Sequence, residues 1–147
     1  MSENPLPEGA TREGALQMAA DAVRGTMMER IGIEWLDIGL ERVVARIPVA
    51  GNTQVYGQLH GGATAALCES VGSIGTAVAA GLDKMVVGVQ LSVNHLRAVR
   101  DGHITATGVP LRVGRTIALW DMRVHDDEQR LIASATLTVA IREVLAD

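Results

Sequence analysis

The sequence predicts an α+β domain in which one long apolar helix lies on a face of a largely antiparallel six-stranded sheet. The predicted helix follows a His-Gly-Gly turn and continues to Gly81 in residues that are almost all small or apolar, which is typical of a buried central helix. Two strand-like stretches precede this helix and four follow it. Short turns join the later stretches, and they favour antiparallel pairing because parallel strands need longer crossovers.

The segment before the long helix predicts one amphipathic helix and two strands. Residues 15–29 carry apolar side chains at helical spacing. Residues 33–38 and 42–49 follow as two strands, and Pro48 is expected to end the second strand or to lie at an edge. Residues 50–59 predict a loop rich in turn residues.

The segment after the long helix predicts strands at residues 85–99, 104–113, 116–125 and 131–141. Pro110 indicates a bulge or an edge position in the second of them. Alternation in the first strand places a set of side chains on one face: Val87, Val89, Leu91, Val93 and His95. The last strand shows the clearest alternation, and its predicted inward side chains are Leu131, Ala133, Ala135, Leu137, Val139 and Ile141.

Length and composition indicate a single domain over residues 15–147 after a flexible tail of residues 1–14. Of the 147 residues, 48% are hydrophobic and 20% are charged, which suits a globular chain with a real core. The tail is polar and lacks the apolar stretch of a signal peptide. We therefore expect the protein in the cytoplasm.

Charge and residue content argue against several partners and cofactors. A net charge of −4 and only three aromatic residues, two Trp and one Tyr, give no basis for binding nucleic acid. The single cysteine excludes an intramolecular disulfide, and the histidine spacing indicates no metal site. No glycine motif for nucleotide binding is present, so no cofactor is expected. The long helix could span a membrane by length, but Glu69 near its middle argues against insertion.

Glu69 is the first candidate for chemistry because no other side chain of the predicted helix is normally charged. A carboxylate inside a buried helix is costly unless it is paired, hydrogen-bonded or used. Burial would raise its pKa and suit it to act as a general base or nucleophile near neutral pH. The alternative is a surface glutamate between apolar neighbours. Ser73 lies one turn further on the same face, spaced to hold a water for the carboxylate.

The turn His60-Gly61-Gly62 is the second candidate. Free amides at the start of a helix can bind an anion or a polarised carbonyl oxygen, and glycines let a ligand approach closely. The alternative is a plain loop-to-helix turn. Gly61 and Glu69 are roughly 12 Å apart along one helix axis. If both serve one reaction, a second subunit supplies one of them, which predicts an obligate oligomer with its site at the interface.

Two further nucleophiles are less favoured. The stretch Gly72-Ser73-Ile74-Gly75 resembles a nucleophile elbow only loosely, because it lies inside a helix and no strand runs into it. The pattern therefore argues against a Ser-His-Asp hydrolase. Cys68 is more typical of a small core residue than of a nucleophile.

Residues 15–143 resemble a hotdog-fold thioesterase of the PaaI-like group, which includes the Arthrobacter-type 4-hydroxybenzoyl-CoA thioesterase and the proofreading thioesterase of enterobactin synthesis. The resemblance is carried by Gln54, by LHGGA at 59–63, and by Glu69 and Ser73. In that group a Gln six residues before the HGG histidine and an acid nine residues after it recur, and both spacings hold here. VVGVQLSVNHLR, which contains His95, and PLRVGRT also look like the second half of the family.

The resemblance implies a hotdog fold and the hydrolysis of an acyl-CoA or acyl-carrier-protein thioester. Glu69 would be the nucleophile or the base that activates water. The Gly61 amide and the Gln54 side chain would polarise the thioester carbonyl. His60 would position the thioester or orient the turn, and Ser73 would hold the water.

The resemblance also implies substrate-binding residues and an assembly. His95 would line the acyl pocket, with Gly62 close to the substrate. Arg115, beside Gly114 in the VGRT turn, is a candidate for the CoA phosphates, as are the arginines Arg97, Arg100 and Arg112. Members of the group are homodimers that pair into homotetramers, so the same assembly is expected here.

Two other functions remain open. A hotdog hydratase or dehydratase usually has a Pro-rich HFP-type loop, which is absent here. A non-catalytic acyl-CoA binding module would have no use for a buried base. The acyl group is also open, because few aromatics and the glycines at 72, 75 and 88 would permit either an aryl or a medium alkyl chain. The mechanism is open as well, because direct attack by Glu69 and attack by a water that Glu69 activates would use the same carboxylate.

Overall fold

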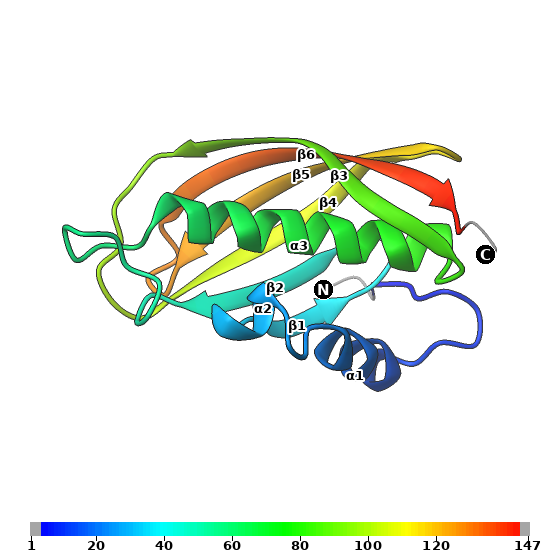
Figure 1. Ribbon diagram of the computed structural model, residues 1–147, viewed down its shortest axis with the longest axis horizontal. Coiled ribbons are helices and arrows are strands. Elements are labelled where there is room, and N and C mark those ends of the chain that lie inside the picture. The colour runs from blue at the N-terminus through cyan, green and yellow to red at the C-terminus, as the bar shows by residue number, and fades with distance from the viewer. Residues whose placement is uncertain (1–3, 145–147) are drawn as a thin grey trace.

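The computed structural model describes residues 4–144 as an antiparallel sheet of six strands that curves around one long helix (Figure 1). The strand order across the sheet is β1-β2-β4-β5-β6-β3, and every neighbouring pair is antiparallel. The predicted α+β hotdog architecture is therefore confirmed. The elements in chain order are α1 (Arg12–Ala22), α2 (Met27–Arg30), β1 (Glu34–Ile38), β2 (Val43–Pro48), α3 (Gly61–Ala80), β3 (Lys84–His95), β4 (His103–Val113), β5 (Ile117–Asp126) and β6 (Leu131–Glu143).

The central helix α3 packs closely on the sheet because two of its inward positions are glycines. A methyl group at Gly75 would overlap the indole ring of Trp120, and one at Gly72 would lie 2.7 Å from Leu137 Cδ2. The fully buried Trp120 donates its Nε1–H to Thr76 Oγ1 at 2.9 Å. These glycines therefore accommodate core side chains of β5 and β6. The expectation that they leave room for an acyl group is wrong.

By length and composition α3 is also a candidate membrane span, and 50% of the apolar window is buried inside the fold. The sheet covers the buried side of the helix, with Leu67 and Val71 fully enclosed. The buried central helix of a globular domain can have the same length and composition as a membrane span, so these two properties do not make α3 a membrane helix.

Strand β3 differs from the predicted alternation because it contains a bulge. Its pairing with β6 shifts between Gly88 and Gln90, so Val89 is an extra residue in the ladder. An extra residue reverses which side chains face inward. Val87 and Val89 are therefore exposed, at 47% and 63%, whereas Leu91 and Val93 beyond the bulge pack against the core as expected. The strand also ends at His95 rather than at 99.

Other proline and edge predictions have mixed outcomes. Strand β2 ends at Pro48, and the pairing of β4 with β5 shifts just after Pro110, as the sequence predicts. At the start of β6, however, Leu131 is 39% exposed and Ile132 is 2% exposed. A register shift near His125 places Ile132 inward instead.

The N-terminal helix is shorter than predicted and begins earlier. Helix α1 starts after Thr11, whose hydroxyl accepts a hydrogen bond from Gly14 N at 3.1 Å. It ends at Ala22, and Gly25 with φ 73° turns the chain into the separate helix α2. The prediction of a single helix over residues 15–29 is therefore wrong, because two separate helices occupy this part of the chain.

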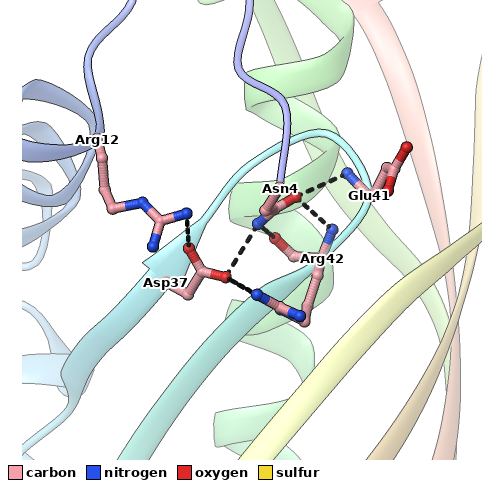
Figure 2. A network of polar contacts seen from close by, with 5 residues as sticks. All are labelled: Asn4, Arg12, Asp37, Glu41 and Arg42. Atoms are coloured by element: carbon pink, nitrogen blue, oxygen red, sulfur yellow. Dashed lines mark hydrogen bonds and ion pairs between the residues drawn. The ribbon is translucent and has the colours of Figure 1, made fainter. Parts of the chain in front are cut away.

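The chain before α1 lies against the β1–β2 turn, which is at odds with a flexible tail over all of residues 1–14 (Figure 2). Asn4 is 7% exposed, and its Nδ2 donates to Asp37 Oδ2 at 3.1 Å and to Arg42 O at 2.8 Å. Asn4 Oδ1 accepts from the backbone N–H groups of Glu41 and Arg42. Asp37 also pairs with Arg42 Nη2 at 2.6 Å and with Arg12 Nη2 at 3.3 Å. Residues 1–3 of the tail and 145–147 of the predicted domain lie outside the described residues.

Candidate active site

The first turn of α3 leaves one backbone amide free. His60 is the N-cap residue, and its Nδ1 accepts a hydrogen bond from Gly62 N at 2.8 Å. The His60 carbonyl accepts from Ala63 N at 3.0 Å and from Thr64 N at 3.4 Å. Gly61 N makes no hydrogen bond to any part of the chain between residues 4 and 144. His60 therefore fixes the turn, and the helix offers the Gly61 amide to a ligand.

His95 of β3 lies directly beside this amide. A methyl group at Gly61 would be 2.9 Å from His95 Nε2, so glycine lets the imidazole ring lie directly against the backbone here. His95 is the last residue of its strand and pairs with Ala133 of β6. The structure thus brings together the histidine and the glycine that the sequence analysis placed in one site.

The loop before α3 places Gln54 at the same end of the helix. The loop is closed by hydrogen bonds from Gln54 N to Gln58 O at 2.8 Å and from His60 N to Asn52 O at 2.8 Å. The side-chain carbonyl Oε1 of Gln54 accepts from Tyr56 N at 2.6 Å. The oxygen is engaged by a backbone donor, and the two N–H donors of the Gln54 amide make no hydrogen bond within residues 4–144.

These groups border a cavity of about 370 Å³ at the N-terminal end of α3. Its lining combines polar side chains with an apolar wall: Gln54, Gln58, Leu59, Gly61, Thr64, His95, Leu96, Arg97, Ala98, Val99 and Ile132. The cavity matches the usual character of a small-molecule site, which is mostly apolar with a few polar groups that set orientation. Two amide donors aimed at one point can stabilise a developing negative oxygen.

Glu69 lies outside this cavity and is exposed in the single chain. Its carboxylate rests against Gly88 of β3, where a methyl group would overlap it. The expectation of a buried carboxylate is therefore wrong for one chain, because this face of α3 lies beside the edge strand β3, beyond which the sheet does not continue. Ser73, one turn further along α3, is partly buried. One chain does not bring Glu69 and Ser73 together with Gly61 and Gln54.

Gly114 and Arg115 lie toward the other end of the sheet. Gly114 N donates to Ile117 O at 2.9 Å in the β4–β5 turn, and Arg115 borders a separate hollow of about 300 Å³ with Arg142 and Glu143. Thr116 pairs with Ile141 of β6, whereas His95 pairs with Ala133, eight residues earlier on that strand. That separation is roughly 26 Å at the usual rise of a strand. Arg115 and Gly114 therefore do not share the cavity within one chain.

Among the other candidate arginines, Arg97 is the one that lines the cavity. Arg100 lies nearby and donates from Nη1 to Tyr56 O at 3.3 Å, which ties it to the loop that carries Gln54. Arg112 lies beside Gly114, about 3.7 Å from where a methyl group there would be.

Comparison with known proteins identifies the family. The model of the thioesterase superfamily matches residues 56–133, which is more than half of the chain. The chain belongs to the thioesterase superfamily. It is 36% identical to the proofreading thioesterase EntH of Cronobacter turicensis over 118 residues, which cover 80% of this chain and 86% of that protein.

Two further comparisons agree. The 1,4-dihydroxy-2-naphthoyl-CoA hydrolase of Escherichia coli is 35% identical over 118 residues, 80% of this chain and 87% of that enzyme. The crystal structure of a thioesterase from Haemophilus influenzae superposes with a TM-score of 0.85 at 31% identity, covering 96% of both chains. This protein is thus a hotdog thioester hydrolase, as the sequence resemblance implies.

Cys68 and Thr64 show one correct and one missed assignment from the sequence of this thioesterase. Cys68 is fully buried, and burial raises the pKa of its thiol to about 12, so it is a core residue and not a nucleophile. Thr64, by contrast, lines the cavity and was missed. Its position three residues after Gly61, on the same side of the helix, was the available signal.

Proposed function

We propose that this thioesterase hydrolyses acyl-CoA or acyl-carrier-protein thioesters in the cytoplasm, in sites that combine Gly61, Gln54 and His95 of one subunit with Glu69 and Ser73 of another. The observation that carries the proposal is the cavity at the start of α3, which the free Gly61 amide and the Gln54 side chain both border and which no carboxylate among the described residues lines. Hydrolysis needs a base or nucleophile opposite the carbonyl donors. Glu69 is the candidate, and it lies too far along its own helix.

The edge strand β3 supports a homodimer. A free edge exposes unpaired backbone groups that readily pair with another chain. Next to that edge lie the exposed Val87 and Val89, and the Glu69 carboxylate packs against the same strand at Gly88. Antiparallel pairing of two β3 strands would satisfy the backbone groups of this edge and run the two α3 helices in opposite directions. Each Glu69 would then approach the helix start of its partner, and two such dimers would form the proposed tetramer.

In the proposed reaction, the carbonyl oxygen of the thioester accepts hydrogen bonds from Gly61 N–H and the Gln54 amide. Glu69 attacks the carbonyl carbon, or removes a proton from a water held by Ser73 that attacks it. The C–S bond then breaks and the thiolate takes up a proton. After direct attack by Glu69, water also has to hydrolyse the mixed anhydride between Glu69 and the acyl group, so that either route ends in a carboxylic acid and a free thiol. His60 keeps the turn in place, and His95 with Gly62 borders the acyl group. Arg115 and Gly114 of a neighbouring subunit, with Arg97, are proposed to contact the CoA phosphates.

The test is thiol release from a panel of aryl- and alkyl-CoA thioesters and from an acyl-carrier protein. We expect steady turnover of at least one thioester, detected with a thiol reagent, and the panel then identifies the acyl class and the carrier. If the protein binds the esters but releases no thiol, a non-catalytic binding module is the correct function. If it adds water to, or removes it from, the acyl chain instead, the hydratase or dehydratase alternative is correct.

A shared site predicts that two inactive variants restore each other. Glu69→Gln and Gln54→Ala each remove a different half of the proposed site. Subunits mixed after reversible dissociation should recover about a quarter of wild-type activity, because half of the dimers are mixed and one of their two sites keeps both residues. Each variant mixed with itself under the same conditions is the matched control. No recovery in a mixture that mass spectrometry shows to contain mixed dimers would rule out the shared site.

A further inference from the structure

Thr64 is a buried residue whose hydroxyl has no hydrogen-bond partner among residues 4–144. The residue is 1% exposed and lines the cavity at the start of α3. Two other hydroxyls on α3 bond back to the carbonyl one turn earlier: Ser70 to Ala66 O at 2.8 Å and Thr76 to Gly72 O at 2.7 Å. The Thr64 hydroxyl makes no such bond, nor any other side-chain hydrogen bond within residues 4–144.

This hydroxyl faces the cavity. Within residues 4–144, the side-chain polar atoms that are shut off from solvent and make no hydrogen bond are Trp35 Nε1 and Asp37 Oδ1, and the latter forms an ion pair with Arg12 instead. The unpartnered Thr64 oxygen is not one of them, so the small exposed area of Thr64 includes this oxygen. Side chains on a helix tilt toward its N-terminus, which aims the group toward Gly61. A hydroxyl left unpaired in such a site is costly, and a ligand atom that bonds it is favoured.

The thioester oxygen does not require this third donor. The Gly61 amide and the Gln54 amide already supply two donors in the proposed function, and a carbonyl oxygen has two lone pairs. Gly61 and Thr64 are three residues apart, so that the Gly61 amide and the Thr64 hydroxyl lie on the same side of the first turn of one helix. Hydrogen bonds of about 2.9 Å from both groups therefore reach two neighbouring oxygens of one acyl group.

We propose that Thr64 is a specificity residue that hydrogen-bonds an oxygen on the β carbon of the acyl group, as in an ortho-hydroxyaroyl or a 3-hydroxyacyl thioester. This inference rests on the proposed function of the cavity. The wall beyond Thr64 is formed by Leu59, Val99 and Ile132, so the rest of the acyl group contacts apolar side chains. An acyl group without the oxygen leaves the Thr64 hydroxyl unpaired and binds less well.

The test compares matched thioesters in wild type, Thr64→Val and Thr64→Ser. The substrate pairs are 2-hydroxybenzoyl-CoA with benzoyl-CoA, and 3-hydroxyoctanoyl-CoA with octanoyl-CoA. Valine keeps the shape without the hydroxyl, and serine keeps the hydroxyl. For Thr64→Val we expect kcat/KM to fall about tenfold on the better hydroxylated substrate, which corresponds to the loss of one hydrogen bond. On the matching substrate without the hydroxyl, kcat/KM should change less than about twofold. Thr64→Ser should keep the wild-type preference. Equal losses on both members of each pair would overturn the inference.

A binding measurement separates this inference from the proposed function. The probes are non-hydrolysable ketone analogues of both substrate pairs, in which a methylene group separates the carbonyl from the sulfur. Calorimetry should show that Thr64→Val weakens only the hydroxylated analogue. If wild type shows that preference but releases no thiol, the inference stands and the catalytic proposal fails. If wild type hydrolyses thioesters but binds both analogues of each pair equally, or binds none, the Thr64 inference is overturned and the catalytic proposal stands.

Discussion

Replacement of Glu69 by Gln is expected to lower kcat by roughly 10²–10⁴-fold, the usual contribution of one catalytic acid–base group. Gln has nearly the same shape but cannot accept a proton from water or act as a nucleophile. KM should change little, because the proposed donors to the thioester carbonyl come from Gly61 and Gln54 and are untouched. The measurement is the rate of thiol release from the best thioester of the panel.

The fold should tolerate this substitution. Glu69 is exposed in the single chain, and its carboxylate contacts Gly88, a position without a side chain. Thermal unfolding and the oligomeric state of Glu69→Gln should therefore match those of wild type. Glu41→Gln is the matched control, an exposed carboxylate in the β1–β2 turn for which full activity is expected. Wild-type turnover by Glu69→Gln would show that another group is the base.

The strands and the central helix could be predicted because their patterns are local. In β5, alternate residues from Ala118 to Val124 are buried, as the sequence indicates. The bulge at Val89 could not be predicted, since one extra residue reverses the pattern without a signal in composition. The place of Asn4 depends on partners more than thirty residues away, such as Asp37, and no periodicity records such contacts.

The parts of the site that lie within one local segment could be predicted, whereas the parts that depend on distant residues or on a second subunit could not. The turn that presents Gly61 is local, and the cap by His60 forms within that turn. The place of His95 beside Gly61 brings together residues far apart in sequence, and only the family resemblance pointed to it. The burial of Glu69 was inferred from its apolar neighbours on α3, but the face it occupies is open in one chain. Its environment therefore depends on whether a second subunit covers β3, which a single sequence does not encode in any local pattern.

Replacement of Gly75 by Ala is expected to destabilise the domain by about 1–2 kcal/mol. Alanine in place of glycine inside a helix normally stabilises by about 0.5–1 kcal/mol. At this position the added methyl group would overlap the ring of Trp120, which is fully buried and held by its hydrogen bond to Thr76. Overpacking of a core usually costs about 1–3 kcal/mol, and a ring that is fixed on several sides cannot move away cheaply. The overlap therefore outweighs the helix preference.

Thermal or denaturant unfolding measures this effect, with a decrease in Tm of roughly 2–4 °C for each kcal/mol in a chain of this size. The control is a double-mutant cycle with Trp120→Phe, because the smaller ring does not reach the atoms that the methyl group would overlap. Gly75→Ala should cost at least about 1 kcal/mol less in that background. Additive costs would mean that the helix moves away from the sheet to admit the methyl group. The close packing of α3 on β5 would then not be what requires glycine at this position.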